Sequence, residues 1–291
     1  MGTLFVVATP IGNLSDMTPR AIETLRLVSL IAAEDTRHTL RLLRHFGIET
    51  PMLSYHAHNE RGRRERLMGA LELGDVALVT DAGTPAISDP GNDLVATALA
   101  AGFAVSPIPG ASSLIAAVSA SGLVPGPFVV LGFLTRRGRE RSVELGRAAA
   151  VGMPLVLFEA PNRLVDTLDF LRESLGDRLV TVARELTKVH EEVRHGIMSV
   201  VADYYRRQPP RGEVVIVVGG APVMASRADG DDDEDVIRSL LRAGLSVSQA
   251  AREAASLTGR PRSELYELAR RLRAIDAAGD AAPSGRPYEG E

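Results

Sequence analysis

Residues Val76–Pro85 have the sequence VALVTDAGTP, and this stretch decides the fold class. Val76–Thr80 is a short apolar run rich in β-branched residues, which is typical of a buried strand. A polar, glycine-containing turn, Asp81–Pro85, follows the run at once and indicates a connection from a strand to a helix. Gly83 allows a backbone to approach a ligand closely, and Asp81 or Thr84 can hydrogen-bond a ribose or an amino-acid head group, although a simple structural turn has the same letters.

The same pattern recurs through the first 120 residues. Apolar runs at 4–8, 28–33 and 104–108 each end in a polar turn, and helices are predicted for 19–27 with Thr18 as cap, from Thr36 or Thr39 to Gly47, and for 94–101. This alternation predicts an α/β domain with a mostly parallel sheet. Ligands bind outside the carboxyl ends of such strands, where every one of these turns falls.

A second domain is expected after the hinge-like segment LVPGP at 123–127. Its predicted strands are 128–133, 154–159, 179–183, 196–201 and 213–218, with helices at 139–151 and 161–175. The predicted domains are therefore 1–123 and 124–222, followed by an acidic linker at 223–233, a helical appendix at 234–275 and a disordered tail at 276–291. In the appendix we expect Ser248 to cap the middle helix, Gly259 to end it and Pro261 to help start the last.

Composition excludes several classes of protein. The 291 residues include no cysteine, so disulfides, thiolate catalysis and cysteine-ligated metal sites are ruled out. No stretch approaches the length of a membrane span. The start, MGTLFVVATP, has the pattern of a strand and lacks the basic region of a signal peptide. We therefore expect a cytoplasmic enzyme.

The net charge of −4 argues against an RNA partner, but the distribution of the charges does not. Six acids lie between Asp229 and Asp235, and without them the chain would be slightly basic. Arginine clusters elsewhere are able to meet phosphates, although solvated helix faces have the same composition. The clustered residues are Arg61, Arg63, Arg64, Arg66, Arg136, Arg137, Arg139, Arg141, Arg206, Arg207 and Arg211, with Arg252, Arg260, Arg262, Arg270 and Arg271 in the appendix.

Two nucleotide-binding fingerprints are missing, and other segments offer weaker chemistry. No G-x-G-x-x-G and no G-x-x-x-x-G-K-[ST] occurs, which argues against a nicotinamide enzyme and a P-loop NTPase. Pro109–Ser113 places hydroxyls and N–H groups at a helix start, a good site for a carboxylate. His56 and His58, two residues apart on an expected extended segment, make only a weak case for a metal without a third ligand.

Taken together and in order, these segments resemble one family. They are ATPIGNLSDMTPRA, IAAEDTRHT, LSYHAHNE, LVTDAGTPAISDPG, PIPGASS, LFEAPNRL and ARELTKVHEE. In this order they resemble the ribosomal RNA small-subunit methyltransferase I family of the tetrapyrrole-methylase superfamily. The resemblance covers residues 4 to about 220, and the C-terminal helices resemble that family's helix-turn-helix-like appendix.

The resemblance implies a two-domain α/β fold with a mostly parallel first sheet, a mixed second sheet and a small helical appendix. It implies that S-adenosylmethionine binds in the cleft between the domains, and that a homodimer methylates the 2′-hydroxyl of a cytidine in the decoding region of 16S ribosomal RNA. The relatives have an acid where this chain has Thr84, which leaves the partner of the cofactor's amino group open. The implied cofactor contacts are Pro10, Ile11, Gly12, Asp81, Gly83, Thr84, Pro85, Ile87, Ser112, Ser113, Phe158 and Ala183.

A ribose hydroxyl is a poor nucleophile, so a base or a hydrogen-bond acceptor should assist the transfer. Glu34, Asp35, His56, Glu185 and Lys188 are the candidates, with the acidic turn or Lys188 preferred. Lys188 acts as a base only if burial lowers its pKa, and is otherwise a surface lysine. We therefore predict Glu34, Asp35, Arg37 and Lys188 as catalytic residues, and His56, His58, Asn59 and Glu185 as substrate contacts, with no metal.

Two other functions stay open from the sequence alone. A methylase acting on a tetrapyrrole would share fold and cofactor, but its open apolar trough fits poorly with 4% aromatic residues and no tryptophan. A non-enzymatic nucleic-acid-binding protein would use 234–275 as a helix-turn-helix.

Overall fold

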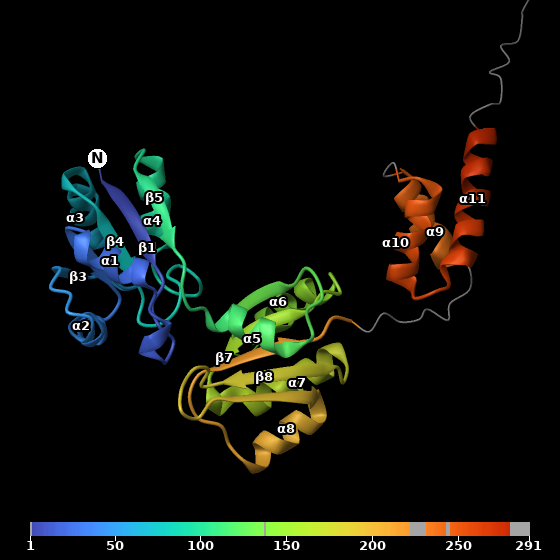
Figure 1. Ribbon diagram of the computed structural model, residues 1–291. Coiled ribbons are helices and arrows are strands. Elements are labelled where there is room, and N and C mark those ends of the chain that lie inside the picture. The colour runs from blue at the N-terminus through green and yellow to red at the C-terminus, as the bar shows by residue number, and fades with distance from the viewer. Residues whose placement is uncertain (1, 137, 222–230, 243–244, 280–291) are drawn as a thin grey trace, which may run out of the picture. The chain divides into compact units, whose positions relative to one another are not determined.

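The computed structural model describes residues 2–136, 138–221, 231–242 and 245–279. The chain divides into two units, Met1–Gly220 and Ala221–Glu291, and the first unit holds two five-stranded sheets (Figure 1). The strands are β1 (Thr3–Val7), β2 (Leu30–Ala33), β3 (Met52–Ser54), β4 (Val76–Val79), β5 (Ala104–Ile108), β6 (Val129–Phe133), β7 (Leu155–Glu159), β8 (Leu179–Arg184), β9 (Glu192–Ile197) and β10 (Val214–Val218). The helices are α1 (Pro19–Leu27), α2 (Thr36–His45), α3 (Glu60–Leu73), α4 (Asn92–Ala100), α5 (Ser113–Ser121), α6 (Arg139–Ala149), α7 (Leu164–Leu175), α8 (Met198–Arg207), α9 (Asp231–Arg242), α10 (Val247–Thr258) and α11 (Arg262–Gly279).

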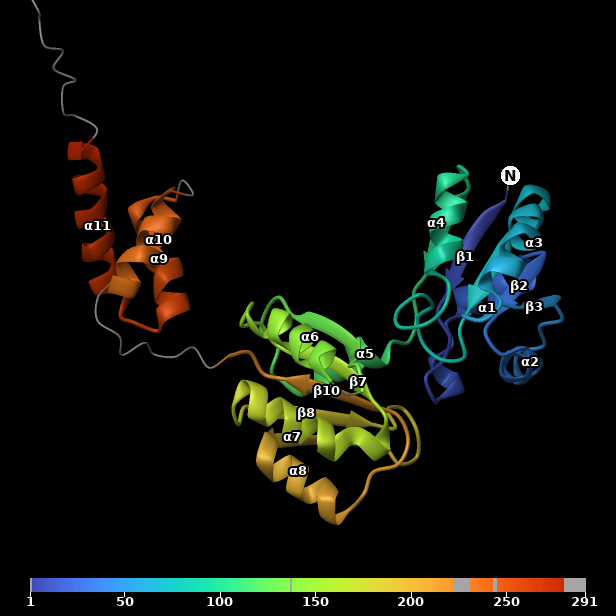
Figure 2. The ribbon, with the colours of Figure 1, turned by 180° about the vertical axis from the view of Figure 1, so that it is seen from behind.

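The first sheet is parallel throughout, in the order β3-β2-β4-β1-β5. Its strands are short and apolar because helices cover both faces (Figure 2). Side chains of α1 and α2 form a core on one face, and those of α3 and α4 form a core on the other. The predicted parallel α/β domain is thus confirmed, and its polar turns share one edge of the sheet.

Helix starts follow local chemistry. The Thr18 hydroxyl accepts a hydrogen bond from the N–H of Ala21 at 3.2 Å, with Pro19 in the first turn of α1, which confirms the predicted cap. The Asp35 carboxylate caps α2 by accepting from the N–H of Arg37 at 2.8 Å, so α2 begins at Thr36. The capping aspartate therefore comes from the acidic turn that ends β2.

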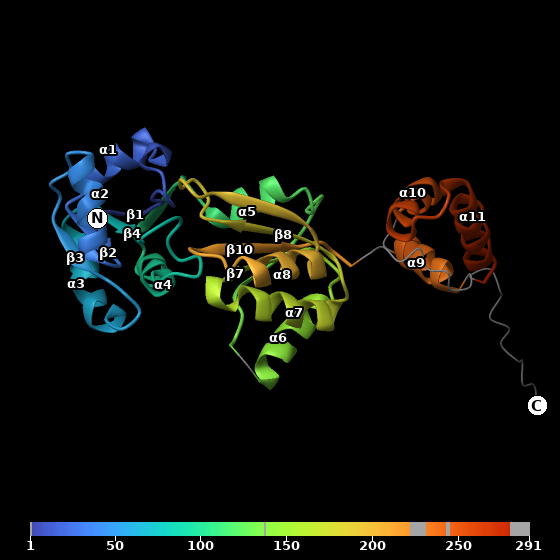
Figure 3. The same ribbon diagram turned by 90° about the horizontal axis from the view of Figure 1, so that it is seen from below.

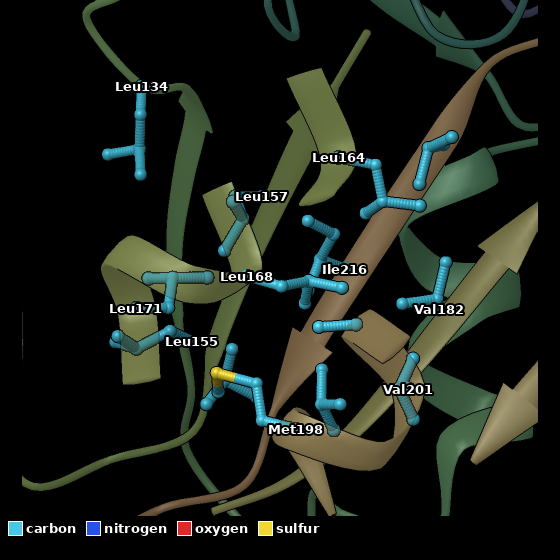
Figure 4. Close-up of a cluster of buried hydrophobic side chains, with 14 of the residues drawn as sticks. Leu134, Leu155, Leu157, Leu164, Leu168, Leu171, Val182, Met198, Val201 and Ile216 are labelled. Carbon is cyan, nitrogen blue, oxygen red and sulfur yellow. The ribbon is translucent and has the colours of Figure 1, made fainter. Parts of the chain in front are cut away.

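The second sheet is mixed, in the order β6-β7-β10-β8-β9, with only β6 and β7 parallel. One face carries α6, α7 and α8 over a large aliphatic core, part of which is drawn in Figure 4. The other face is covered by α5, through Leu114 and Ala117. Helix α5 lies inside the predicted first domain, 1–123, yet packs on the second sheet, so the chain passes from one sheet to the other at residues 109–112 and not at the predicted hinge.

The predicted strand at 196–201 is wrong. The edge strand β9 ends at Ile197, and α8 begins at Met198. Met198, Val201, Ala202 and Tyr205 are buried at helical spacing against the core of the second sheet, and this burial favours a helix over a continued strand. The apolar letters of this segment suit either structure, and the packing decides.

The described residues of the C-terminal unit form three helices, α9 to α11, around Ile237, Ala251, Ala254 and Leu265 (Figure 3). Gly259 ends α10 with φ 71°, as predicted, because glycine adopts this left-handed conformation without strain.

Three boundaries in this unit differ from the prediction. Ser246, and not Ser248, caps α10 in a capping box with Gln249. Helix α9 begins within the predicted linker 223–233, and α11 extends into the predicted tail 276–291. The parts of those two predictions at 223–230 and 280–291 lie outside the described residues. Among the helices of the described residues, none is long and apolar enough to cross a membrane.

Candidate cofactor and substrate pockets

Backbone hydrogen bonds join the turns at the carboxyl edge of the first sheet. Thr9 and Gly83 exchange both N–H···O bonds, at 2.9 and 3.0 Å, which ties the turn after β1 to the turn after β4. The Thr84 hydroxyl donates to the carbonyl of Ala111 at 3.3 Å, which adds the turn after β5. Three turns therefore form one surface, positioned by three neighbouring strands.

A pocket of about 570 Å³ opens between this surface and the second sheet. Its size lies in the usual range for a small-molecule site. It lies among the first sheet's turns, the start of α5, the ends of β6, β7 and β8, and the start of β10. We call it the larger pocket. It is lined by Ile11, Ala82, Gly83, Thr84, Ile87, Ser88, Asp89, Ser112, Ser113, Leu114, Phe133, Phe158, Glu159, Ala160, Pro161, Ala183, Glu185, Leu186, Lys188, Gly212, Glu213, Val214 and Val215.

The larger pocket combines aromatic, anion-binding and acidic groups. The rings of Phe133 and Phe158 lie 5.5 Å apart between centroids, and Phe133 is 58% exposed. The N-terminal turn of α5 borders the pocket with Ser112 and Ser113, and such a turn favours a negative group. A purine-like ring, a carboxylate and a cation all find complementary partners in this one pocket.

A second, smaller pocket of about 290 Å³ adjoins the first. Ile11, Ala82, Lys188 and Glu213 line both pockets and so form a shared wall. The smaller pocket takes side chains from α2 and from the turns after β1 and β4. Its other lining residues are Thr9, Pro10, Gly12, Leu14, His38, Thr39, Arg41, Leu42, Thr80 and Asp81.

Lys188 lies across the shared wall as a paired cation. Its Nζ donates to Glu185 Oε1 at 2.9 Å and lies 3.5 Å from Glu213 Oε2. A Cβ on Gly12 would overlap the Lys188 side chain, so glycine is needed there. Burial alone would lower the pKa of Lys188, but the two carboxylates outweigh burial and raise it. Lys188 therefore stays protonated, which does not favour the predicted role as a base.

Strain marks the segment that carries Lys188. Glu185 and Thr187 both have positive φ, at 50° and 67°, a conformation that side chains other than glycine rarely adopt. The Glu185 carboxylate also accepts the N–H of Glu213 at 3.3 Å, beside Gly212, where any Cβ would overlap it. Such strain concentrates at functional sites.

The acidic turn after β2 faces the turn after β4. Glu34 Oε2 accepts the Thr80 hydroxyl at 2.6 Å and the N–H of Asp81 at 3.3 Å. The Asp35 carboxylate is occupied by Arg37, whose guanidinium and N–H hold the pKa of Asp35 well below its usual range. Asp35 and Arg37 therefore neutralise each other at the surface, and neither lines a pocket.

Asp89 completes this acidic group from the larger pocket. The Thr80 hydroxyl lies 3.0 Å from Asp89 Oδ2. Burial, opposed by the contact with Thr80 and reinforced by the charges of Glu34, Asp81 and Glu213, raises the pKa of Asp89 to about 6. Ala86 and Ser88 have positive φ, at 66° and 63°, so the loop that presents Asp89 is strained as well.

The structure brings most predicted cofactor residues together but separates them into two groups. Ile11, Gly83, Thr84, Ile87, Ser112, Ser113, Phe158 and Ala183 line the larger pocket. Pro10, Gly12 and Asp81 line the smaller one, while Pro85 is buried and lines neither. Glu34 reaches the smaller pocket only through Thr80 and Asp81.

The predicted substrate contacts divide in the same way. Glu185 lines the larger pocket, but His56, His58 and Asn59 line neither. They form a hydrogen-bonded turn and not the expected extended segment. The backbone N–H of Asn59 donates to the carbonyl of His56 at 2.8 Å, and Asn59 Oδ1 accepts the N–H of His56 at 2.9 Å. No group of three or more potential metal ligands occurs among the described residues.

Sequence reasoning missed Asp89, Phe133 and Glu213. Asp89 stood within the quoted motif, where its burial was not visible. Phe133 ends a predicted strand, and its place at a carboxyl end was the one sign in the sequence that it could line a site. Glu213 precedes β10, which runs antiparallel to its neighbours, so the rule of carboxyl ends does not find it.

Comparisons with known proteins agree with this geometry. The family model of tetrapyrrole (corrin/porphyrin) methylases matches residues 3–202, and that of the RsmI C-terminal HTH domain matches 227–273. A protein of Synechocystis sp. named ribosomal RNA small subunit methyltransferase I is 50% identical over 94% of this chain and 99% of its own length. A Pseudomonas aeruginosa protein of the same name is 44% identical over 92% and 96%.

Solved structures show the same fold at lower identity. Diphthine synthase matches with a TM-score of 0.58 at 15% identity, over 75% of this chain and 90% of its own. The Thermus thermophilus uroporphyrin-III C-methyl transferase complexed with S-adenyl homocysteine matches with a TM-score of 0.54 at 20% identity, over 75% and 97%. Family models, curated relatives and fold together show that this chain is a methyltransferase that belongs to the ribosomal RNA small subunit methyltransferase I family, within the tetrapyrrole methylases.

Proposed function

We propose that this protein transfers a methyl group from S-adenosylmethionine to the ribose 2′-hydroxyl of a cytidine in the decoding region of 16S ribosomal RNA. One observation carries the proposal: a larger pocket and a smaller one share a wall formed by Ile11, Ala82, Lys188 and Glu213. A transfer reaction needs its donor and acceptor held side by side. The names of the relatives support the small-subunit RNA as substrate.

The larger pocket fits the methyl donor by the chemistry of its lining. Phe133 and Phe158 offer ring faces to an adenine, and the N-terminal turn of α5 suits the carboxylate of the amino-acid part. Glu185 and Glu213 supply negative charge for the amino group. Bound there, S-adenosylmethionine supplies an electrophilic methyl group on a positively charged sulfur.

The chain's own residues then align the reactants and exclude water. The turns after β1 and β4, joined through Thr9 and Gly83, fix the wall against which the transfer takes place. Lys188 neutralises one of the two carboxylates beside it, so the group keeps a net negative charge that suits a cationic donor. Little covalent chemistry is required of the protein beyond accepting one proton.

The smaller pocket suits the target nucleotide. His38, Arg41 and Asp81 offer both donors and acceptors to a base edge, and Leu14 and Leu42 offer apolar contact. RNA-modifying proteins of this kind read a nucleotide that is turned out of its stack. Exposed arginines such as Arg61 and Arg66 are available to phosphates, whereas Arg64, Arg141 and Arg260 are already bonded to neighbouring side chains.

Incubation with tritiated S-adenosylmethionine tests the proposal. We expect label in small ribosomal subunits, at a nucleotide that resists alkaline cleavage, because methylation blocks the 2′-hydroxyl. Uroporphyrinogen serves as the competing acceptor in a parallel reaction. Label in the porphyrin and none in RNA would refute the proposed substrate.

Sedimentation equilibrium of the full chain tests the proposed homodimer, and a monomer mass at micromolar concentration would contradict it.

A further inference from the structure

A single hydroxyl lies between two carboxylates at the edge of the pockets. Thr80 Oγ1 is 2.6 Å from Glu34 Oε2 and 3.0 Å from Asp89 Oδ2. A threonine hydroxyl has one proton to donate and lone pairs with which to accept. Both contacts are therefore hydrogen bonds only when one of the carboxyl groups carries a proton of its own. With both acids ionised, the group is one proton short.

The surroundings direct the extra proton to Asp89. Glu34 already accepts the shorter Thr80 bond and the N–H of Asp81. Asp89 has only the longer contact with the Thr80 hydroxyl, is partly buried, and faces the negative charges of Glu34, Asp81 and Glu213. From the β8 side, Glu185 and Lys188 line the same pocket as a mutually paired couple.

The position of the pair matches the proposed reaction. Asp89 lines the larger pocket and Thr80 lines the smaller one, so their contact crosses the boundary at which donor and acceptor would meet. Thr80 is fixed there because its carbonyl accepts the Thr9 hydroxyl at 3.2 Å. Lys188, the other candidate on this boundary, is held as a cation by two carboxylates.

We propose that Asp89 is the proton acceptor in the methyl transfer, and that Thr80 and Glu34 are positioning residues that act through it. The inference rests on the proposed function. As the acceptor oxygen forms its bond to the methyl carbon, and the carbon–sulfur bond breaks with its electron pair going to sulfur, Asp89 takes the hydroxyl proton. Protonated Asp89 then donates to Thr80, which donates to Glu34, so both hydrogen bonds are complete. Asp89 later releases the proton to water.

Replacement of Asp89 tests the role directly. We expect Asp89→Asn to lower kcat on the order of 100-fold or more, the usual size of a general-base contribution. Its dissociation constant for S-adenosylmethionine, measured by calorimetry, should stay within about threefold of wild type, a free-energy difference below about 0.7 kcal/mol. Asp75→Asn is the matched control and should keep wild-type kcat, because Asp75 is exposed, immediately precedes β4 and bonds the N–H of Thr3. Unchanged kcat in Asp89→Asn, or a loss explained by weaker cofactor binding, overturns the proposal.

The pH profile separates a base from a structural residue. Wild-type kcat should fall below about pH 6, where Asp89 becomes protonated. Thr80→Val removes the hydroxyl that joins Asp89 to Glu34, so the pH of the acid limb should change, while Asp89→Glu should recover part of the activity. An acid limb that stays in place in Thr80→Val contradicts the positioning role.

A readout without RNA keeps the proposal distinct from the proposed function. In infrared difference spectra of wild type minus Asp89→Asn, we expect a protonated-carboxyl band that disappears as pH rises through about 6. Absence of that band at pH 5 refutes the assignment of the proton to Asp89. If wild type and Asp89→Asn are equally active, the role of Asp89 is refuted and the proposed function stands. If wild type labels no RNA, the proposed function and this inference are refuted together.

Discussion

Asp89 illustrates how the burial of one acid can act against folding. Its pKa is about 6, against about 4 for an unfolded aspartate. Between about pH 4 and 6 the native state binds a proton that the unfolded state has released, so native stability falls as pH rises through this window. Above pH 6 Asp89 is ionised in both states, and the free energy of unfolding is lowered by the full cost of its charge in the native state.

This sign leads to a prediction for Asp89→Asn. The amide mimics the protonated acid and can donate to Thr80 permanently, so the variant should be more stable than wild type at pH 7.5. After discounting for solvent screening, we expect about 1–2 kcal/mol. Urea unfolding at pH 7.5 and pH 4 measures it, and the difference should vanish at the lower pH. A variant less stable than wild type at pH 7.5 would show that Asp89 is not strained by its charge.

Gly212 is the second residue with a sharp consequence. It has φ 80°, and a Cβ there would overlap the Glu185 carboxylate. We expect Gly212→Ala to destabilise the protein by about 2 kcal/mol or more, from left-handed strain and displacement of Glu185. Gly126→Ala is the control, because a Cβ at Gly126 meets open space. Equal urea midpoints for the two variants would contradict this account.

The sequence allowed the candidate acids and bases to be named but not ranked. Lys188 was preferred because a buried lysine can lose its proton, yet Glu213, which arrives from β10, keeps it charged. The sequence does not single out Asp89, because its raised pKa depends on burial and on Glu34 and Asp81, which come from other turns. A pKa depends on neighbours in space, and these neighbours come from strands distant along the chain.

At the scale of elements, the cap of α10 separates two serines that look alike in sequence. The Ser246 hydroxyl accepts from the N–H of Gln249 at 3.4 Å, and Gln249 Oε1 accepts the N–H of Ser246 at 3.0 Å. Ser248 lies inside the helix and only accepts from Arg262 at 3.2 Å. We expect Ser246→Ala to destabilise α10 by about 1 kcal/mol and Ser248→Ala to have little effect. Hydrogen exchange of the α10 amides in the full chain measures both, and a larger effect for Ser248→Ala would contradict the assignment.

Elements were predicted well where a strand is buried on both faces. β2 and β4 read as continuous apolar runs because helices cover the middle of the parallel sheet on each side. The edge strand β9 alternates instead, and apolar letters at its end belong to α8. Helix α5 was predicted as a helix but assigned to the wrong domain, because a helix sequence shows that a face is apolar but not which sheet will cover it.

At the scale of the whole molecule, every lining residue of the two pockets lies before Gly220. A chain ending at Gly220 keeps both sheets and their cores. We therefore expect its affinity for S-adenosylmethionine to stay within about twofold of the full chain, while methyl transfer to small subunits falls by about tenfold or more, for lack of basic contacts in α9 to α11. Calorimetry and tritium transfer measure the two. Full transfer by the shortened chain would remove RNA contact as the role of the appendix.

The crossing at residues 109–112 has a consequence for how the enzyme responds to its ligands. The chain passes from the first sheet to the second at this segment, and Ala111 is bonded to Thr84 while Ser112 borders the larger pocket. A molecule occupying that pocket therefore touches the segment at which the chain crosses from one sheet to the other. We expect a small ligand there to hold the two sheets in one arrangement. If the proposed function is right, binding of the methyl donor and of RNA would then be coupled through this segment.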